Sequence, residues 1–235
     1  MKLAALYSGG KDSTFSVYRA MKDGHQVSCL ITMLPDRDDS LFFHYPNAYC
    51  TVYQAECLGM PLISTKTKCE SKEQELDALE QALAETKQTF AIDGIVTGGL
   101  ASKFQQENFQ QVCNKLGLKY YSPSWSVDQM QYMQDLLANN FLIMIVGVSA
   151  SGLDERWLGR ILDSSALNEL ESLSKKHGFS IAFEGGEAET FVLDCPIFKK
   201  RIAIRNAKKH WDGVRGYFEI LDVILHDKSS KLSSS

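Results

Sequence analysis

The stretch Tyr7-Ser8-Gly9-Gly10-Lys11-Asp12-Ser13 decides the fold that we predict for this chain. It lies between an apolar run at residues 3–7, which predicts a short buried strand, and an amphipathic run at residues 13–23, which predicts a helix. Two adjacent glycines let the backbone turn sharply and approach an anion without side-chain clashes. The N–H groups of such a turn and the positive end of the following helix favour phosphate. Residues 8–13 therefore predict a phosphate site where a strand passes into a helix.

The side chains of this loop add to the prediction. Ser8 and Ser13 can donate hydroxyl hydrogen bonds to phosphate oxygens, and Lys11 brings a positive charge. Asp12 is the nearest carboxylate for a Mg²⁺ ion, although capping of the helix is an equally good interpretation. The spacing is not that of a Walker A loop. A plain strand–helix connection with Ser13 as the N-cap is the structural alternative, which the combination of these side chains disfavours.

Further strands and helices alternate after this loop. Strands are expected at residues 27–33, 62–65, 94–97 and 119–121, and helices at residues 70–90 and 102–116. This alternation is typical of an α/β fold with a Rossmann-like parallel sheet, which binds its ligands at the carboxyl ends of the strands. Residues 8–13, 44–47 and 98–102 each follow an expected strand, so we expect them to converge at one edge.

The pattern changes after Trp125. Helices are expected at residues 128–139 and 164–177, and strands at residues 141–149, 180–183, 191–193, 201–205 and 217–225. We therefore predict a nucleotide-binding domain at residues 1–125, a smaller α+β domain for the substrate at residues 126–228, and a flexible tail at residues 229–235.

Composition excludes several classes of protein. The 235 residues carry a net charge of −4, which gives no reason to expect direct nucleic-acid binding. The six cysteines form no Cys-x-x-Cys pair, so the sequence encodes no local zinc or dithiol motif. The apolar run at residues 141–148 is too short to cross a membrane, and the N-terminus lacks the pattern of a signal peptide. We expect a cytoplasmic protein without membrane contact; a homodimer is left open.

Two more glycine motifs have possible roles in a site. Gly98-Gly99-Leu100-Ala101-Ser102 repeats the strand–glycine–helix order, although a structural turn explains it equally well. Residues 183–190, Phe-Glu-Gly-Gly-Glu-Ala-Glu-Thr, pack three carboxylates around two glycines. Like charges so close raise one another's pKa unless a cation is near, which favours a site over a solvated acidic turn. The motif could contact Mg²⁺, act as a general base for an amine, or recognise a cationic substrate group.

Together these motifs resemble the diphthine–ammonia ligases, especially their short archaeal-type form, within the N-type ATP pyrophosphatases of the PP-loop and HUP folds. The resemblance runs from Lys2 to about Asp227. It is carried by the stretches at residues 7–13, 43–47, 99–102, 149–159, 184–194 and 211–213. Relatives often carry an arginine in the helix after the second glycine turn, where this chain has Gln105-Gln106-Glu107-Asn108, so no role is assigned there.

The resemblance implies that ATP, with Mg²⁺, adenylates the carboxylate of diphthine on translation elongation factor 2, and that ammonia then displaces AMP. It implies catalytic roles for Lys11, Asp12, Glu187 and Glu189, with Asp12 as the metal ligand. ATP is expected at Tyr7, Ser8, Gly9, Gly10, Lys11, Asp12, Ser13, Thr32, Gly98, Gly99 and Ser102. The acceptor is expected at His44, Asn47, Trp125, Glu184, Gly185, Gly186, Glu187 and Thr190.

Other functions stay open at this stage. A related ligase could adenylate another carboxylate, such as a small metabolite or cofactor precursor. A nucleotide-sensing module would bind ATP or AMP without turnover and would release no pyrophosphate with any acceptor. A tRNA-thiolating enzyme is disfavoured because paired cysteines and a basic surface are absent from the sequence. Trp125 as an interdomain packing residue and His44 as a structural histidine are the plain interpretations of those two side chains.

Overall fold

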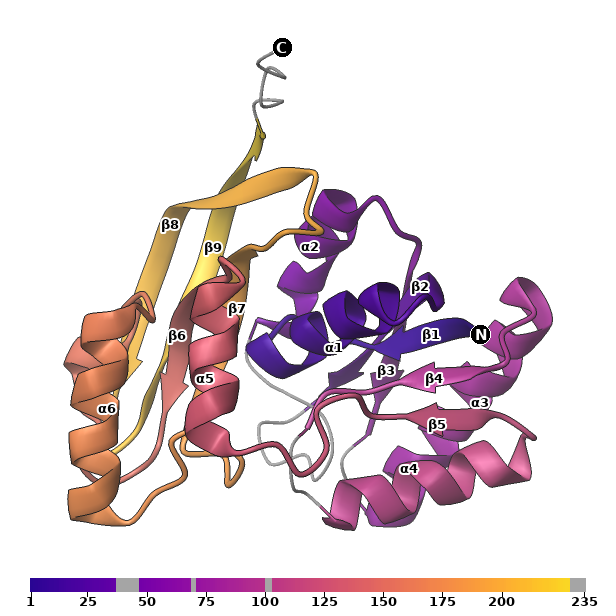
Figure 1. The fold of residues 1–235 in the computed structure, drawn as a ribbon, viewed down its shortest axis with the longest axis horizontal. Helices are drawn as coiled ribbons and strands as arrows, with labels where there is room; N and C mark the ends of the chain where they lie inside the picture. Colours follow the sequence, from indigo (N-terminus) through magenta and orange to yellow (C-terminus); the bar gives the residue numbers. More distant parts are fainter. Residues whose placement is uncertain (37–46, 69–70, 100–102, 229–235) are drawn as a thin grey trace.

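Parallel strands build the first half of the chain in the computed structural model, which describes residues 1–36, 47–68, 71–99 and 103–228 (Figure 1). The sheet has the order β3-β2-β1-β4-β5, and all its pairs are parallel. Its strands are β1 (Lys2–Leu6), β2 (Gln26–Pro35), β3 (Leu62–Thr67), β4 (Gly94–Val96) and β5 (Lys119–Tyr121). The predicted parallel sheet is confirmed. Chain order reverses between β1 and β4, and such a switch point opens a crevice at the carboxyl ends of the two strands.

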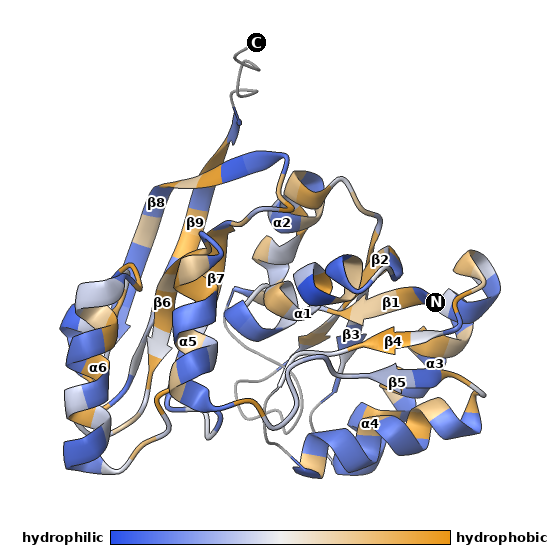
Figure 2. Cartoon of the chain, viewed as in Figure 1, coloured by the Kyte–Doolittle hydropathy of each residue, from blue (hydrophilic) through white to orange (hydrophobic). Residues whose placement is uncertain are grey.

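Helices cover both faces of this sheet because its central strand is apolar on both sides. Leu3 and Ala5 belong to one core with residues of α1 (Lys11–Lys22) and α2 (Thr51–Leu58). Ala4 belongs to a second core with α3 (Lys72–Phe90) and α4 (Lys103–Lys115). In Figure 2, apolar residues occupy β4 and most of β1, and hydrophilic and apolar residues alternate along α4. The short elements η1 (Ala48–Cys50) and α2 were not predicted.

The second half forms an antiparallel sheet with the order β7-β6-β9-β8. It comprises β6 (Leu142–Val148), β7 (Ala188–Asp194), β8 (Lys200–Trp211) and β9 (Gly216–Asp227), with α5 (Gln129–Ala138), η2 (Glu155–Trp157) and α6 (Ser164–His177). The strand predicted at residues 180–183 is wrong, because these residues form turns. Ile181, Ala182 and Phe183 are buried in the hydrophobic core without forming a strand, and Phe183 has a φ of 63°, which does not fit a strand.

The two halves share one hydrophobic core. Phe15 of α1 packs against Tyr132 of α5 and Phe141, with ring centroids 5.4 and 5.3 Å apart. Tyr18 of α1 donates a hydrogen bond of 2.7 Å to Asn139, at the end of α5. Figure 1 shows α1 lying between the first sheet and α5, so the helix that follows the glycine loop is held from both sides. Within the described ranges, no helix is both long and apolar enough to cross a membrane.

Candidate active site

The loop between β1 and α1 presents backbone donors at the sheet switch point. Gly9 has a φ of 81°, and Gly10 is the N-cap of α1, with no side-chain hydrogen bond to the cap. Ser13 is therefore not the N-cap; its hydroxyl accepts from Ser8 N–H at 3.3 Å and donates to Gly10 O at 3.2 Å. In the described part of the chain, the N–H groups of Asp12 and Ser13 have no acceptor. A helix start left open in this way can take a phosphate.

The second glycine turn touches the first, as predicted. A Cβ atom on Gly98 would lie 2.5 Å from the carbonyl carbon of Asp12 and 2.6 Å from Ser13 N. Only glycine therefore lets the segment after β4 approach the first turn of α1 so closely. Gly99 has a φ of 116°, a conformation that side chains rarely adopt. Ser102, which we expected to contact ATP, lies outside the described residues, as does His44.

Lys11, which is buried, and Asp12, which is half-buried, form an ion pair that reaches into the second half of the chain. The Lys11 side chain is 2% exposed, and its Nζ lies 2.7 and 2.8 Å from the two carboxylate oxygens of Asp12. Tyr132 of α5 donates its hydroxyl to Asp12 Oδ1 at 2.8 Å. Burial, with the nearby Asp12 carboxylate, raises the pKa of Tyr132 well above its ordinary value, so the phenol stays a donor. Sequence reasoning missed Tyr132, because a tyrosine on an amphipathic helix looks like a core residue.

Strand β7 clamps the loop from the other side. Lys11 N–H donates to Thr190 Oγ1 at 3.1 Å, and Val192 N–H donates to Gly9 O at 3.0 Å. The fully buried Gln54 donates through Nε2 to both Gly9 O and Val192 O, each at 2.8 Å. Its Oε1 atom has no partner among the described residues. Gln54 was also missed, since helix α2 that carries it was not predicted.

The acidic motif lies beside the loop, although its carboxylates are partly engaged. Glu187 accepts from Ser180 N–H at 2.9 Å and from Gly185 N–H at 2.8 Å, so it braces the turn that precedes β7. Phe183 places its ring 5.6 Å from Lys11 Nζ. Glu184 is close enough to Tyr132 to contribute to the raised pKa of that phenol. The two motifs singled out in the sequence thus meet around Lys11.

Other predicted residues lie farther from the loop or support it. Thr32 donates to Tyr7 O at 2.7 Å, and the Tyr7 hydroxyl lies 3.0 Å from Thr14 Oγ1, so both stabilise the base of the loop. Asn47 pairs with β9 instead, donating to Phe218 O at 2.8 Å and accepting from Ile220 N–H at 2.9 Å. Trp125 is half-buried in the connection between β5 and α5. The roles predicted for these residues toward ATP or acceptor remain predictions.

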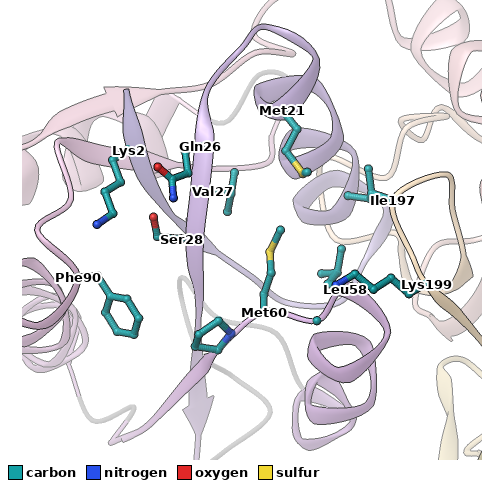
Figure 3. A pocket seen from close by; sticks show the side chains of 12 residues that line it. Lys2, Met21, Gln26, Val27, Ser28, Leu58, Met60, Phe90, Ile197 and Lys199 are labelled. Atoms are coloured by element: carbon teal, nitrogen blue, oxygen red, sulfur yellow. The ribbon is translucent and has the colours of Figure 1, made fainter.

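A separate pocket lies at the opposite end of the parallel sheet from the glycine loop. It measures about 500 Å³ and is lined by Lys2 and Gln26, which begin β1 and β2, and by Pro61, which precedes β3. Figure 3 shows Met60, Leu58 and Ile197 among its apolar side chains, with Lys199 beside them. These are the amino ends of the strands, so this pocket is not the site that the glycine loop forms.

Known proteins similar to this chain belong to one family. The N-terminal domain of diphthamide synthase matches residues 1–120, and the C-terminal domain of diphthamide synthase matches residues 128–225. Diphthine–ammonia ligase of Homo sapiens is 32% identical over 257 residues, which cover 99% of this chain and 95% of that protein. The Bos taurus ligase is 32% identical over 98% of this chain and 94% of its own length.

More distant similarities differ in extent. The diphthine–ammonia ligase of Schizosaccharomyces pombe is 32% identical over 94% of this chain, which corresponds to 39% of that longer protein. A solved structure, described as a predicted subunit of tRNA methyltransferase from Methanocaldococcus jannaschii, covers 83% of this chain at 16% identity with a TM-score of 0.40.

Proposed function

This chain belongs to the diphthamide synthase family, and from that premise we propose that it is a diphthine–ammonia ligase, which uses ATP to convert the carboxylate of diphthine to the amide of diphthamide. Relatives that carry this activity match almost the whole chain. One observation from the fold supports the proposal most strongly. Lys11 of the glycine loop contacts Thr190 and Phe183 of the acidic motif, so a nucleotide bound to the loop would lie beside the motif to which we assign the acceptor.

The first chemical step is adenylation. A carboxylate oxygen of diphthine attacks the α-phosphorus of ATP, the bond to the bridging oxygen of the β-phosphate breaks, and pyrophosphate leaves with that electron pair. The open N–H groups of Asp12 and Ser13 and the hydroxyl of Ser8 are suited to hold the phosphates. Lys11 can offer its charge to them once it leaves Asp12, with which it is paired here.

The second step is amide formation. Ammonia attacks the acyl carbon, the bond from that carbon to the AMP oxygen breaks, and the nitrogen loses a proton. Free ammonia is the simplest nitrogen source, because no described cysteine resembles the thiolate that a glutaminase needs. Burial raises the pKa of Cys50, Cys113 and Cys195 to about 12 and that of Cys29 and Cys57 to about 11. The carboxylates of Glu187 and Glu189 are our candidates to take the proton or to bind the quaternary ammonium group of diphthine.

The residues near the loop fit a Mg²⁺ ion that arrives with ATP. Among the described residues, no three His, Cys, Asp or Glu side chains could hold a metal together. Mg²⁺ in nucleotide sites commonly needs only one or two carboxylates beside phosphate oxygens and water, and Asp12 supplies one, 32% exposed. When bound, the ion would neutralise charge on the departing pyrophosphate.

We propose elongation factor 2 as the protein acceptor and free ammonia as the second substrate. The test supplies ¹⁵N-ammonium, ATP and Mg²⁺ to the enzyme with elongation factor 2 that carries diphthine. Mass spectrometry of the modified peptide should find ¹⁵N in a new amide. The matched control is the same factor without the diphthine modification, which should take up no label. Unlabelled diphthine peptide after full incubation would reject this acceptor.

A further inference from the structure

Tyr132 lies in a position to control the charged pair of the glycine loop. It belongs to α5, outside the sheet that carries the loop, yet its hydroxyl lies 2.8 Å from Asp12 Oδ1. Its side chain is 1% exposed and is fixed by ring packing against Phe15. Close packing around a buried ring restricts its movement, which favours one geometry for the hydrogen bond of the phenol.

We infer that Tyr132 is a positioning residue, which holds the Asp12 carboxylate and, through it, the ammonium group of Lys11. This inference rests on the ligase function proposed above. Asp12 has two described partners, Tyr132 from the second half of the chain and Lys11 from its own helix turn. Lys11 Nζ also lies 5.9 Å from the ring centroid of Tyr132. The phenol therefore holds the Asp12 carboxylate by a hydrogen bond, and its ring lies beside the ammonium group of Lys11.

The consequence concerns the reacting phosphates. A lysine that must transfer its charge from a carboxylate to phosphate oxygens needs that carboxylate to stay in place. If Asp12 could rotate into solvent, its 32% exposed side chain would carry Lys11 away from the loop. Tyr132 opposes that rotation from the second domain. The open N–H groups of Asp12 and Ser13 do not depend on the phenol, so its loss should reduce turnover more than nucleotide affinity.

The test compares Tyr132→Phe with Tyr18→Phe. Each variant removes one tyrosine hydroxyl that donates a hydrogen bond between α1 and the segment of α5 and its C-cap. The Tyr18 hydroxyl donates to Asn139, away from the loop. We expect Tyr132→Phe to lower kcat about 10- to 100-fold, the scale of one hydrogen bond to a charged group, and to change the dissociation constant of ATP less than about threefold. Tyr18→Phe should keep kcat. Equal kcat values for the two variants would overturn the inference.

Two further measurements separate this inference from the function on which it rests. In an Asp12→Ala background, which removes the hydrogen-bond acceptor, Tyr132→Phe should have no further effect on kcat, whereas an undiminished effect would show that the phenol acts elsewhere. Reactivity of Lys11 toward an amine-labelling reagent, read by peptide mass spectrometry against exposed Lys176, needs no acceptor. Tyr132→Phe should raise it by about tenfold, because the pair of Lys11 and Asp12 opens more readily, and Tyr18→Phe should not. If Lys11 labelling is the same in Tyr132→Phe and wild type, the inference is overturned, even if the protein is inactive on diphthine. If the wild type is inactive on diphthine but Tyr132→Phe still raises Lys11 labelling, only the ligase function is rejected.

Discussion

Gly9→Ala tests how tightly Gln54 of α2 holds the glycine loop against β7. A Cβ on Gly9 would lie 2.2 Å from Gln54 Oε1 and 3.1 Å from its Cδ. Gln54 is fully buried, and its amide is held by hydrogen bonds from Nε2 to Gly9 O and Val192 O. The amide must move to admit the methyl group, and both hydrogen bonds are then lost.

The magnitude follows from two contributions. Alanine at the φ of 81° costs about 1–2 kcal/mol, and the two neutral hydrogen bonds of Gln54 contribute about 1 kcal/mol each. The free energy of unfolding should therefore fall by about 3–4 kcal/mol. For a chain of this size, that corresponds to a melting temperature lower by about 6–16 °C.

The assay is urea denaturation with Gly178→Ala as the matched control. Gly178 has a φ of 78° with nothing within 4 Å of a Cβ, so its substitution should cost only the backbone contribution, about 1–2 kcal/mol. In a Gln54→Ala background the space is open, and the cost of Gly9→Ala should fall to that of the control. Equal losses for the two glycine variants, or an unchanged cost of Gly9→Ala without Gln54, would refute the reasoning.

Three further results are expected. Replacing Glu187 and Glu189 with glutamine should raise the KM of the acceptor more than the KM of ATP, since both lie in the acidic motif; equal increases would contradict that assignment. Asn47→Ala should lower the free energy of unfolding by about 1–3 kcal/mol, because β9 loses two hydrogen bonds, and an acceptor KM that stays constant would reject a substrate role for Asn47. Burial raises the pKa of the Cys50 thiol from 9.0 to about 12, so its stabilising contribution is complete below pH 9 and is lost as the pH rises toward 12. Urea denaturation across that range should give a shallower decline for Cys50→Ala than for wild type, and identical slopes would contradict this.

Sequence reasoning found the sheet and the loops because their signals are local. Glycines after an apolar run must turn, and the strand–helix alternation implies parallel pairing, so the amino-acid pattern alone places Gly9 and Gly98 at one edge of the sheet. The strand expected at residues 180–183 was wrong because a short apolar run has the same sequence pattern in a strand and in a buried turn.

The side chains that complete the site could not be found in the same way. Gln54 acts through two carbonyl oxygens, one of them on β7 at Val192, and no local pattern records such a distant partner. Tyr132 has the helical spacing of an ordinary core residue, and only the packing of α5 against α1 brings its hydroxyl to Asp12. Nothing in the sequence around Asn47 indicates that its side-chain amide forms hydrogen bonds with the backbone of β9.

Acceptor-dependent release of pyrophosphate tests the central claim most directly. The enzyme is given ATP, Mg²⁺ and ammonium, with and without elongation factor 2 that carries diphthine, and pyrophosphate and AMP are both measured. We predict release only with the modified factor, with one AMP formed for each pyrophosphate. ATP that binds to the loop but yields no pyrophosphate with this acceptor would contradict the ligase function and leave a nucleotide-binding protein with another substrate.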